Sequence, residues 1–287
     1  MAKQKILFDC DNTMGLPHRE IDDGLALLYL LGRPDLELLG VTTTFGNGAV
    51  DEVQMQTEEL LRRVGRSDVP VVPGAGERHA PPTAAARFLV ETVERYPGQV
   101  ALLATGPLGN LRGAAELDPD FFGRTQRIAC MGGILEPLRI GEHEMPELNL
   151  SADPEAAFQV FHAPCPVTLM NAHVCLQASF QEEDLERVQH WSEGIRLIVR
   201  QWLEAMRCFS GIGAFYLWDL LPAVYVSHPE LFDRHPVWIR SSTEDLEAGR
   251  IVLGEMGDEA EVNMPSQIQD VERFKELLFA AWAQVSI

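Results

Sequence analysis

Apolar and polar residues alternate along the chain at two different periods, which predicts short strands separated by amphipathic helices. Several short runs are almost continuously apolar, as expected for parallel strands that helices cover on both faces. The predicted strands are Lys5–Cys10, Glu37–Thr44, Val100–Ala104, Arg127–Met131 and Val167–Met170. The predicted helices are Asp22–Leu31, Val50–Val64, Ala84–Arg95, Asp153–Phe161, Asp184–Arg207 and Asp219–Val226.

This order of elements predicts an α/β fold with a mainly parallel open sheet and helices on both faces. The chain has 287 residues, a length that suits one large domain. No repeat or long linker divides the sequence, and the proline-rich segment Pro70–Pro82 is predicted to be a loop. We therefore expect a single domain over residues 1–287.

Polar and glycine residues follow the predicted strands at the points where the strands end. These strand-end segments are Asp9–Asp11, Thr42–Asn47, Thr105–Pro107, Met131–Gly133 and Asn171–His173. Open parallel sheets bind ligands beyond the carboxyl ends of their strands. The pattern therefore predicts a functional site at this edge of the sheet.

The charge of the chain narrows the classes of partner. Lys and Arg number 23 against 43 Asp and Glu, so the formal net charge is −20. This acidity opposes binding to nucleic acid polymers and to anionic membranes. No apolar run approaches the roughly 18 residues of a membrane-spanning helix. We expect a small-molecule ligand instead.

The cysteines and the start of the chain predict a cytoplasmic protein. The five cysteines form no Cys-x-x-Cys pair, which argues against a disulfide framework and a zinc cluster. Apolar neighbours around Cys10 and Cys130 favour buried, reduced thiols. The first residues run into a strand-like segment without the apolar region of a signal peptide.

Four carboxylates are predicted to lie together, because Asp9 and Asp11 end the first strand and Asp22 and Asp23 begin the next helix. Such a cluster repels itself unless it holds a cation, and carboxylate oxygens favour Ca²⁺ or Mg²⁺. The alternative is that the two helix residues only interact with the helix dipole, which explains one of them but not the pair on the strand.

One interpretation of the first acidic pair is a phosphatase. The segment Ile6–Thr13 is similar to the first motif of the haloacid dehalogenase phosphatases, in which Asp9 would be the nucleophile and Mg²⁺ would bind the phosphate. Met256–Glu259 could then supply a distal acidic motif. No lysine follows a later strand where the phosphate clamp is expected, so this resemblance covers little of the chain.

A second resemblance runs nearly end to end. The sequence resembles the inosine–uridine-preferring nucleoside hydrolases, Ca²⁺-dependent enzymes that cleave the N-glycosidic bond of ribonucleosides. The similar segments are Asp9–Asp11, Ile21–Leu27, Leu39–Asn47, Leu103–Leu111, Met131–Gly133, Glu147–Ala157, Trp218–Asp219 and His228–Phe232. The same order of motifs at strand and helix edges favours this family over the phosphatases.

The resemblance implies roles for individual residues. It assigns the Ca²⁺ ligands to Asp11, Asp23, the backbone carbonyl of Thr105, and Asp219. It assigns the ribose contacts to Asp22, Asn47, Glu147, Asn149 and Asp219, with Met131 lining the apolar face of the sugar. A backbone carbonyl is an ordinary Ca²⁺ ligand, so Thr105 needs its position more than its side chain.

The implied chemistry suits these residue types. Asp11 would accept a proton from a metal-bound water as general base. Carboxylates and amide oxygens, including that of Asn149, would stabilise the oxocarbenium character of the ribose. The absence of Lys or Arg beside the motifs favours an uncharged nucleoside over a nucleotide.

Two residues bear on the base. Trp218 stands where many members have a histidine that acts near the leaving base. The resemblance implies a catalytic role for this indole, because stacking on a purine would favour protonation of that base as it leaves, and it thereby favours purine nucleosides. Core packing beside Phe215 and Tyr216 is the alternative role of this tryptophan. His79 is the candidate replacement for a family segment that contacts the base. His173 is expected to be structural.

The sequence also departs from the family pattern. The family usually places three residues between its acidic pairs, whereas the ten residues Asn12–Ile21 separate Asp11 from Asp22 here. We expect this extension to loop out and cover the pocket, with surface decoration as the alternative. His18 or Arg19 could then reach the base or the 5′ end.

The resemblance further implies a homo-oligomer, a dimer or a tetramer. A third interpretation is a nucleoside-binding protein with a silent catalytic site, which the complete set of acidic residues disfavours.

Overall fold

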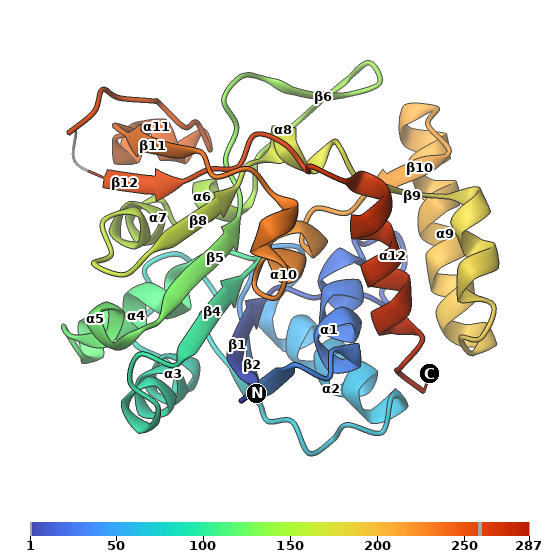
Figure 1. The fold of residues 1–287 in the computed structure, drawn as a ribbon, viewed down its shortest axis with the longest axis horizontal. Helices are drawn as coiled ribbons and strands as arrows, with labels where there is room; N and C mark the ends of the chain where they lie inside the picture. Colours follow the sequence, from blue (N-terminus) through green and yellow to red (C-terminus); the bar gives the residue numbers. More distant parts are fainter. Residues whose placement is uncertain (1, 258–259, 287) are drawn as a thin grey trace.

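A central sheet of eight strands organises the molecule (Figure 1). The structure is a computed structural model that describes residues 2–257 and 260–286. The strands of the sheet are β1 (Gln4–Cys10), β2 (Leu36–Thr43), β3 (Val71–Pro73), β4 (Val100–Ala104), β5 (Arg127–Met131), β8 (Val167–Met170), β11 (Pro236–Ile239) and β12 (Ala260–Asn263). Two small ribbons are β6 (Leu138–Ile140) with β7 (His143–Met145), and β9 (Ser179–Gln181) with β10 (Ala214–Tyr216).

Helices connect the strands. The longer ones are α1 (Asp22–Gly32), α2 (Val50–Arg63), α3 (Ala84–Arg95), α4 (Gly109–Leu117), α7 (Pro154–Phe161), α9 (Glu193–Ser210) and α12 (Val271–Trp282). The shorter ones are α5 (Phe121–Arg124), α6 (Asn149–Ala152), α8 (Ala172–Cys175), α10 (Leu220–Tyr225) and α11 (Thr243–Glu247), with 3₁₀ helices η1 (Glu182–Val188) and η2 (Pro229–Leu231). No described helix is both long and apolar enough to cross a membrane.

The strand order places a ligand crevice beside β1. The order is β11-β12-β8-β5-β4-β1-β2-β3, and all neighbouring pairs are parallel except β11 with β12. From β1 the chain first winds outward through β2 and β3 and then returns to β4 on the other side. Such a reversal opens a crevice at the carboxyl ends of the two central strands.

Each face of the sheet carries its own apolar core. Helices α1, α10 and α12 cover one face, and α3, α4 and α7 cover the other (Figure 1). Leu25, Trp282 and Leu221 are fully buried on the first face, and Leu89, Leu111 and Val160 are fully buried on the second. The strands between them are apolar on both sides, as their sequence predicts.

The predicted single-domain α/β fold is confirmed, with two corrections to its elements. The predicted helix Asp184–Arg207 is wrong, because η1 and α9 are separate helices. The chain breaks so that Trp191 can pack edge-on against Trp282, with ring centroids 5.4 Å apart. The predicted loop Pro70–Pro82 contains β3, which pairs with β2 through Val71–Pro73.

The thiols follow the prediction with one exception. Cys10, Cys130, Cys165 and Cys175 are buried and free, whereas Cys208 is free but exposed on α9.

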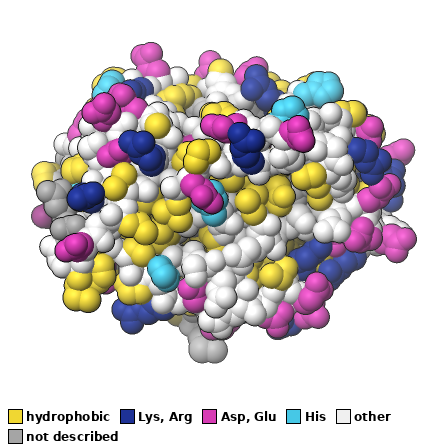
Figure 2. Space-filling model, turned by 90° about the horizontal axis from the view of Figure 1, so that it is seen from above, with side chains coloured by type: hydrophobic (Ala, Val, Ile, Leu, Met, Phe, Trp, Pro, Cys, Tyr) yellow, Lys and Arg dark blue, Asp and Glu magenta, His cyan; other side chains and the backbone are white. Residues whose placement is uncertain are grey.

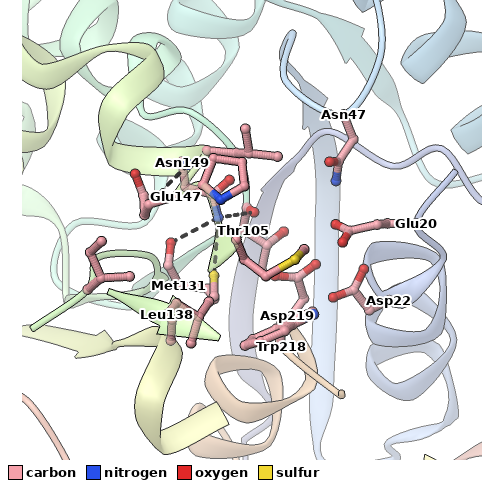
Figure 3. Close-up of a pocket in the computed structure, with 15 residues that line it drawn as sticks. Glu20, Asp22, Asn47, Thr105, Met131, Leu138, Glu147, Asn149, Trp218 and Asp219 are labelled. Carbon is pink, nitrogen blue, oxygen red and sulfur yellow. Dashed lines mark hydrogen bonds between the residues drawn. The ribbon is translucent and has the colours of Figure 1, made fainter. Parts of the chain in front are cut away.

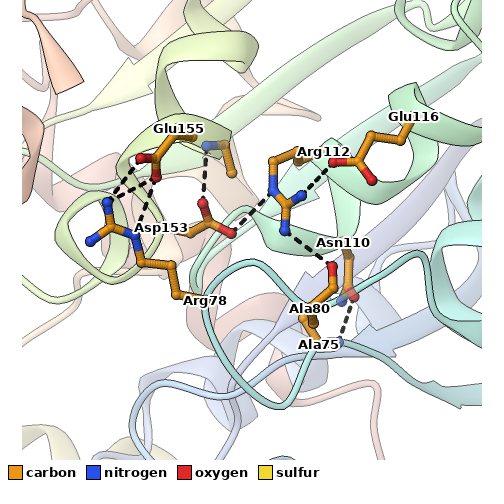
Figure 4. Close-up of polar contacts among 9 residues, drawn as sticks. Ala75, Arg78, Ala80, Asn110, Arg112, Glu116, Asp153 and Glu155 are labelled. Carbon is orange, nitrogen blue, oxygen red and sulfur yellow. Dashed lines mark hydrogen bonds and ion pairs between the residues drawn. The ribbon is translucent and has the colours of Figure 1, made fainter.

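A buried ion pair fixes the loop between β3 and α3 (Figure 4). The Arg112 Nε lies 3.4 Å from a carboxylate oxygen of Asp153, and a second guanidinium nitrogen donates to the Ala80 carbonyl at 3.2 Å. The other Asp153 oxygen accepts from the backbone N–H of Ala156 and begins α7. Arg112 thus connects α4, α7 and the loop.

We expect Arg112→Met to lower the free energy of unfolding by about 3 kcal/mol, because it leaves the fully buried Asp153 carboxylate without its cation. Denaturant titration followed by circular dichroism measures the change. Arg87→Met, on the exposed face of α3, is the control and should change the free energy of unfolding by less than about 0.5 kcal/mol. An Arg112 variant as stable as the control would contradict this role.

Candidate active site

A pocket opens at the carboxyl ends of the central strands, at the point where the strand order reverses. The volume that the centre of a water molecule can occupy in it is about 100 Å³. The lining residues are Glu20, Asp22, Asn47, Thr105, Met131, Ile134, Leu138, Met145, Pro146, Glu147, Leu148, Asn149, Ala172, Trp218 and Asp219. Seen from above, this face carries apolar side chains towards its middle and many charged ones around its rim (Figure 2).

The pocket is acidic on one side and more apolar on the other. Glu20, Asp22 and Asn47 project from one side, and Asp219 lies between the two sides next to Trp218 (Figure 3). Met131 and Leu138 lie on the opposite side, where Glu147 and Asn149 add polar groups. A ligand with one hydroxylated part and one flat apolar part fits this division.

Asp11 lies behind the polar wall in a close-fitting cradle. One carboxylate oxygen, Oδ2, accepts the backbone N–H of Asn47 at 2.6 Å. A Cβ at Gly46 would lie 2.0 Å from that oxygen, and one at Gly106 would lie 3.0 Å from the other. The other oxygen, Oδ1, is buried and accepts no hydrogen bond from a described donor. Because Gly46 and Gly106 have no side chains, two backbone segments can pack against the Asp11 carboxylate, whose Oδ1 atom receives no hydrogen bond from a described donor.

Asp22, Asp23 and Asp219 bring carboxylate oxygens within 4.8 Å of one another, so that they could hold a metal ion. Asp23 accepts the Thr105 hydroxyl at 2.5 Å. Neither oxygen of Asp22 receives a hydrogen bond from a donor in the described part of the chain. Of the four carboxylates predicted to lie together, Asp22 and Asp23 belong to this group, which Asp219 joins from the start of α10. Asp11 lies next to Asp23.

Burial raises the pKa of every carboxyl group in this cluster. The pKa of Asp11 rises to about 7 and that of Asp22 to about 6, mainly because burial removes water from the charged form. Burial and then the neighbouring carboxylates raise the pKa values of Asp23 and Asp219 well above the usual range. A bound cation would lower these pKa values, because it stabilises the ionised carboxylates. The all-carboxylate donor set suits a hard divalent metal.

The opposite rim of the polar region is built by Glu147 and Asn149. Glu147 is half-buried, and its carboxylate accepts the backbone N–H groups of Gly133, Asn149, Leu150 and Ser151, which fixes the start of α6. The Asn149 amide nitrogen donates to the Thr105 carbonyl at 2.8 Å and to the Met131 carbonyl at 3.1 Å. These contacts hold the ends of β4 and β5 together at the pocket.

A hairpin and a tryptophan form much of the apolar wall. Leu138 and Met145 come from the β6–β7 hairpin, whose turn approaches the end of α9 and whose His143 stacks on Phe209 with centroids 4.4 Å apart. Trp218 is half-buried and lies tilted against Tyr216 at a centroid distance of 5.3 Å. The indole therefore lines the pocket and also packs beside Tyr216, the second of which is the packing role considered from the sequence.

Two histidines lie outside the pocket lining. His79, which was expected to contact the base, belongs to the loop that Arg112 fixes and is exposed. Its ring lies close to the carboxylates of Asp153 and Glu155 at the start of α7. The Nε2 atom of His173 accepts the backbone N–H of Glu136 at 3.4 Å, which agrees with a structural role. His79 is therefore not among the residues that line the pocket.

Asp9, the nucleophile of the phosphatase interpretation, is buried beside the cluster and does not line the pocket. One of its oxygens accepts from Thr42 at 2.5 Å and from Asn110 at 2.7 Å, and burial raises its pKa to about 7. Asp258 and Glu259, which completed that interpretation, lie outside the described residues. Asp9 is therefore held by Thr42 and Asn110 away from the cavity, where a phosphate ester would have to reach it.

Glu20 is a carboxylate of the pocket that the sequence analysis did not assign. It belongs to the Asn12–Ile21 extension, which folds back on itself through a hydrogen bond from the Thr13 hydroxyl to the Glu20 carbonyl. The Glu20 carboxyl group is half-buried, bonds to the Asn47 side chain and has its pKa raised to about 8, first by burial and then by Asp22. His18 and Arg19, the residues considered earlier, are exposed.

A parallel sheet with an acidic pocket at its strand-order reversal defines an α/β enzyme with a carboxylate-lined active site. Its family follows from comparison with known proteins. The chain belongs to the inosine-uridine preferring nucleoside hydrolase family, whose model matches residues 6–276. It is therefore a nucleoside hydrolase, an enzyme that cleaves N-glycosidic bonds of ribonucleosides.

Similar proteins carry different substrate names. Uridine nucleosidase 1 of Arabidopsis thaliana is 28% identical, covering 87% of this chain and 82% of its own. The pyrimidine-specific ribonucleoside hydrolase RihA of Shewanella oneidensis is 28% identical, covering 86% of each chain. The fold also matches the purine-preferring ribonucleoside hydrolase of Gardnerella vaginalis, with a TM-score of 0.85, 22% identity and coverage of 98% and 99%.

Proposed function

We propose that this nucleoside hydrolase depends on Ca²⁺ and prefers purine ribonucleosides. The observation that carries the proposal is the group of buried carboxylates at one side of the pocket, in which Asp11 and Asp22 keep oxygens that receive no hydrogen bond from a described donor, opposite apolar side chains on the other side. A ribose suits the first side and a base suits the second. Hydrogen-bond acceptors that line a pocket select ligands with hydroxyl donors.

The residues present suit the metal. Asp11, Asp23, Asp219 and the Thr105 carbonyl would hold it, an all-oxygen set of the kind that Ca²⁺ prefers. When bound, a cation of this kind supplies a water with a lowered pKa. The ribose hydroxyls would be bound by Asp22, Asn47, Glu147, Asn149 and Asp219, with Met131 against the sugar. Glu147 already accepts four backbone donors, so its main contribution would be to position Asn149.

Asp11 is proposed as the general base. Its Oδ1 atom is free of donors, while Oδ2 is fixed by the Asn47 N–H, so the group is held with one oxygen ready to take a proton. The attacking water gives this proton to Asp11 as its oxygen bonds to C1′ of the ribose. The C1′–N bond breaks, its electron pair goes to the base nitrogen, and the base takes up a proton, so that the products are ribose and the free base. Asp22, Asp219 and the amide oxygen of Asn149 would stabilise the positive charge that develops on the sugar.

Trp218 is proposed to stack on the base. The indole is half-buried on the apolar wall next to Asp219, so a base would lie against it when the sugar occupies the acidic side. A larger aromatic surface gains more from stacking, which favours purines.

A panel of ribonucleosides tests the proposal. We expect release of reducing sugar in the presence of Ca²⁺, with a higher kcat/KM for inosine than for uridine. Hydrolysis of uridine in preference to inosine would reverse the proposed base preference. No release from any nucleoside at saturating Ca²⁺ would overturn the proposed activity.

A further inference from the structure

The Asn12–Ile21 extension brings a further carboxyl group into the pocket. The Glu20 side chain lies between Asn47 and Asp22 on the acidic side and points into the cavity (Figure 3). Asp22 begins α1, whereas Glu20 precedes this helix, so one short chain segment directs two carboxyl groups towards the cavity. Glu20 thus belongs to the side of the pocket that is proposed to hold the ribose.

Hydrogen bonds of the extension hold Glu20 in this position. The Asn12 amide donates to the Thr57 hydroxyl of α2 at 3.2 Å, and the Arg19 guanidinium donates to the Asn47 carbonyl at 2.9 Å. A side chain on an anchored segment loses less freedom when a ligand binds to it, which favours a specific contact. Glu20 is therefore a fixed part of the pocket.

The two glutamates that line the pocket differ in the donors that they already accept. Glu147 accepts four backbone N–H groups, which uses much of its capacity. The described donor to Glu20 is the Asn47 side chain. Because a carboxylate offers about four acceptor positions, Glu20 can still accept a hydrogen bond from a ligand hydroxyl.

The stereochemistry of a ribonucleoside determines which hydroxyl groups face Glu20. In a β-ribonucleoside the 2′- and 3′-hydroxyls lie on one face of the ribose ring, and the base and C5′ lie on the other face. When the base lies on the apolar side with Leu138, the two ring hydroxyls point towards the acidic side, from which Glu20 and Asp22 project. The 5′-hydroxyl points away from these two carboxyl groups.

We propose that Glu20 is a specificity-determining residue that accepts a hydrogen bond from the 2′,3′-diol of the ribose. This inference rests on the proposed nucleoside hydrolysis and adds a contact from the extension, to which the family resemblance assigns no role. A pocket built to bind a hydroxyl group discriminates against an analogue that lacks it, because the acceptor is then left unpaired. Glu20 thereby increases the preference for ribonucleosides over ring-deoxy nucleosides.

A thermodynamic cycle tests this contact at saturating Ca²⁺. The substrates are the ribonucleoside that the enzyme cleaves fastest and its 2′-deoxy, 3′-deoxy and 5′-deoxy analogues. For each analogue, the loss of kcat/KM relative to the parent is compared between the wild type and Glu20→Leu, so that intrinsic differences in reactivity cancel. We expect this loss to shrink by about tenfold in the variant for the 2′-deoxy or the 3′-deoxy analogue, and to stay the same for the 5′-deoxy analogue.

Further variants separate a direct contact from an effect on Asn47 or on the fold. Glu20→Ala removes the same oxygens without adding bulk and should give the same change. The effect of Glu20→Leu should persist in an Asn47→Ala background, because a direct contact does not depend on the Asn47 side chain. Glu142→Leu removes an exposed carboxylate from the β6–β7 turn, outside the pocket lining, and should leave every ratio unchanged.

Three results would overturn the role of Glu20 and leave the hydrolase activity standing. They are an unchanged loss for both ring-deoxy analogues, a change confined to the 5′-deoxy analogue, and an effect that disappears in the Asn47→Ala background. A wild type that releases sugar from no ribonucleoside would instead overturn the proposed function itself.

Discussion

Asp11→Asn is expected to lower kcat/KM for ribonucleosides by about a thousandfold, within the range for loss of a general base. The amide is similar in shape and can still face the Asn47 N–H, so the cradle formed by Gly46 and Gly106 remains filled. It cannot take the proton from the attacking water. Steady-state release of reducing sugar measures the loss.

The control for this prediction is Asp120→Asn, which removes an exposed carboxylate before α5 and should keep at least half of the activity. Thermal unfolding of both variants would show whether the folded state is intact. An Asp11→Asn protein that is folded and retains more than about a tenth of the wild-type kcat/KM would exclude Asp11 as the base.

Removal of the metal should abolish activity and change how stability depends on pH. Asp11 has its pKa raised from 3.8 to about 7 in the metal-free fold, so the folded chain holds a proton that the unfolded chain releases. The contribution of Asp11 to the stability of the chelated protein is therefore fully present below the ordinary aspartate pKa and is lost as the pH rises through the raised value. Asp22, with a pKa raised to about 6, contributes in the same direction.

Added Ca²⁺ should restore activity and oppose this loss. At a hundredfold excess over its Kd it would stabilise the fold by about 2.7 kcal/mol, and more strongly at higher pH, where binding displaces fewer protons. Melting temperatures across the pH range, with chelator and with Ca²⁺, measure both effects. A melting temperature that is independent of Ca²⁺ at every pH would contradict a metal site among these carboxylates.

The central sheet could be predicted from the sequence because its strands are buried on both faces. Runs such as Val100–Ala104 have no exposed side, so their apolar continuity is visible without any knowledge of the fold. The short strands β11 and β12 escaped prediction because each alternates between buried and partly exposed residues over four positions. The break before α9 depends on the distant Trp282, which local spacing does not contain.

The site was predictable where it follows strand ends and unpredictable where a loop returns to it. Asp11, Thr105 and Met131 come directly after or at the ends of parallel strands, so their proximity follows from topology. Glu20 reaches the pocket only because the extension folds back against α2 and Asn47. His79 was predicted to contact the base but lies outside the pocket lining, because Arg78 and Arg112 anchor its loop to α7 and α4.

The two walls of the pocket have separate origins, and this has an evolutionary consequence. The acidic wall is carried mainly by the sheet edge and the start of α1, whereas Leu138 and Met145 on the apolar wall belong to the β6–β7 hairpin. Mutations or insertions in that hairpin would change the shape of the apolar side without disturbing the carboxylates that are proposed to perform the chemistry. Exchange of this hairpin between homologous enzymes is therefore a direct route to new base selectivity on an unchanged catalytic core.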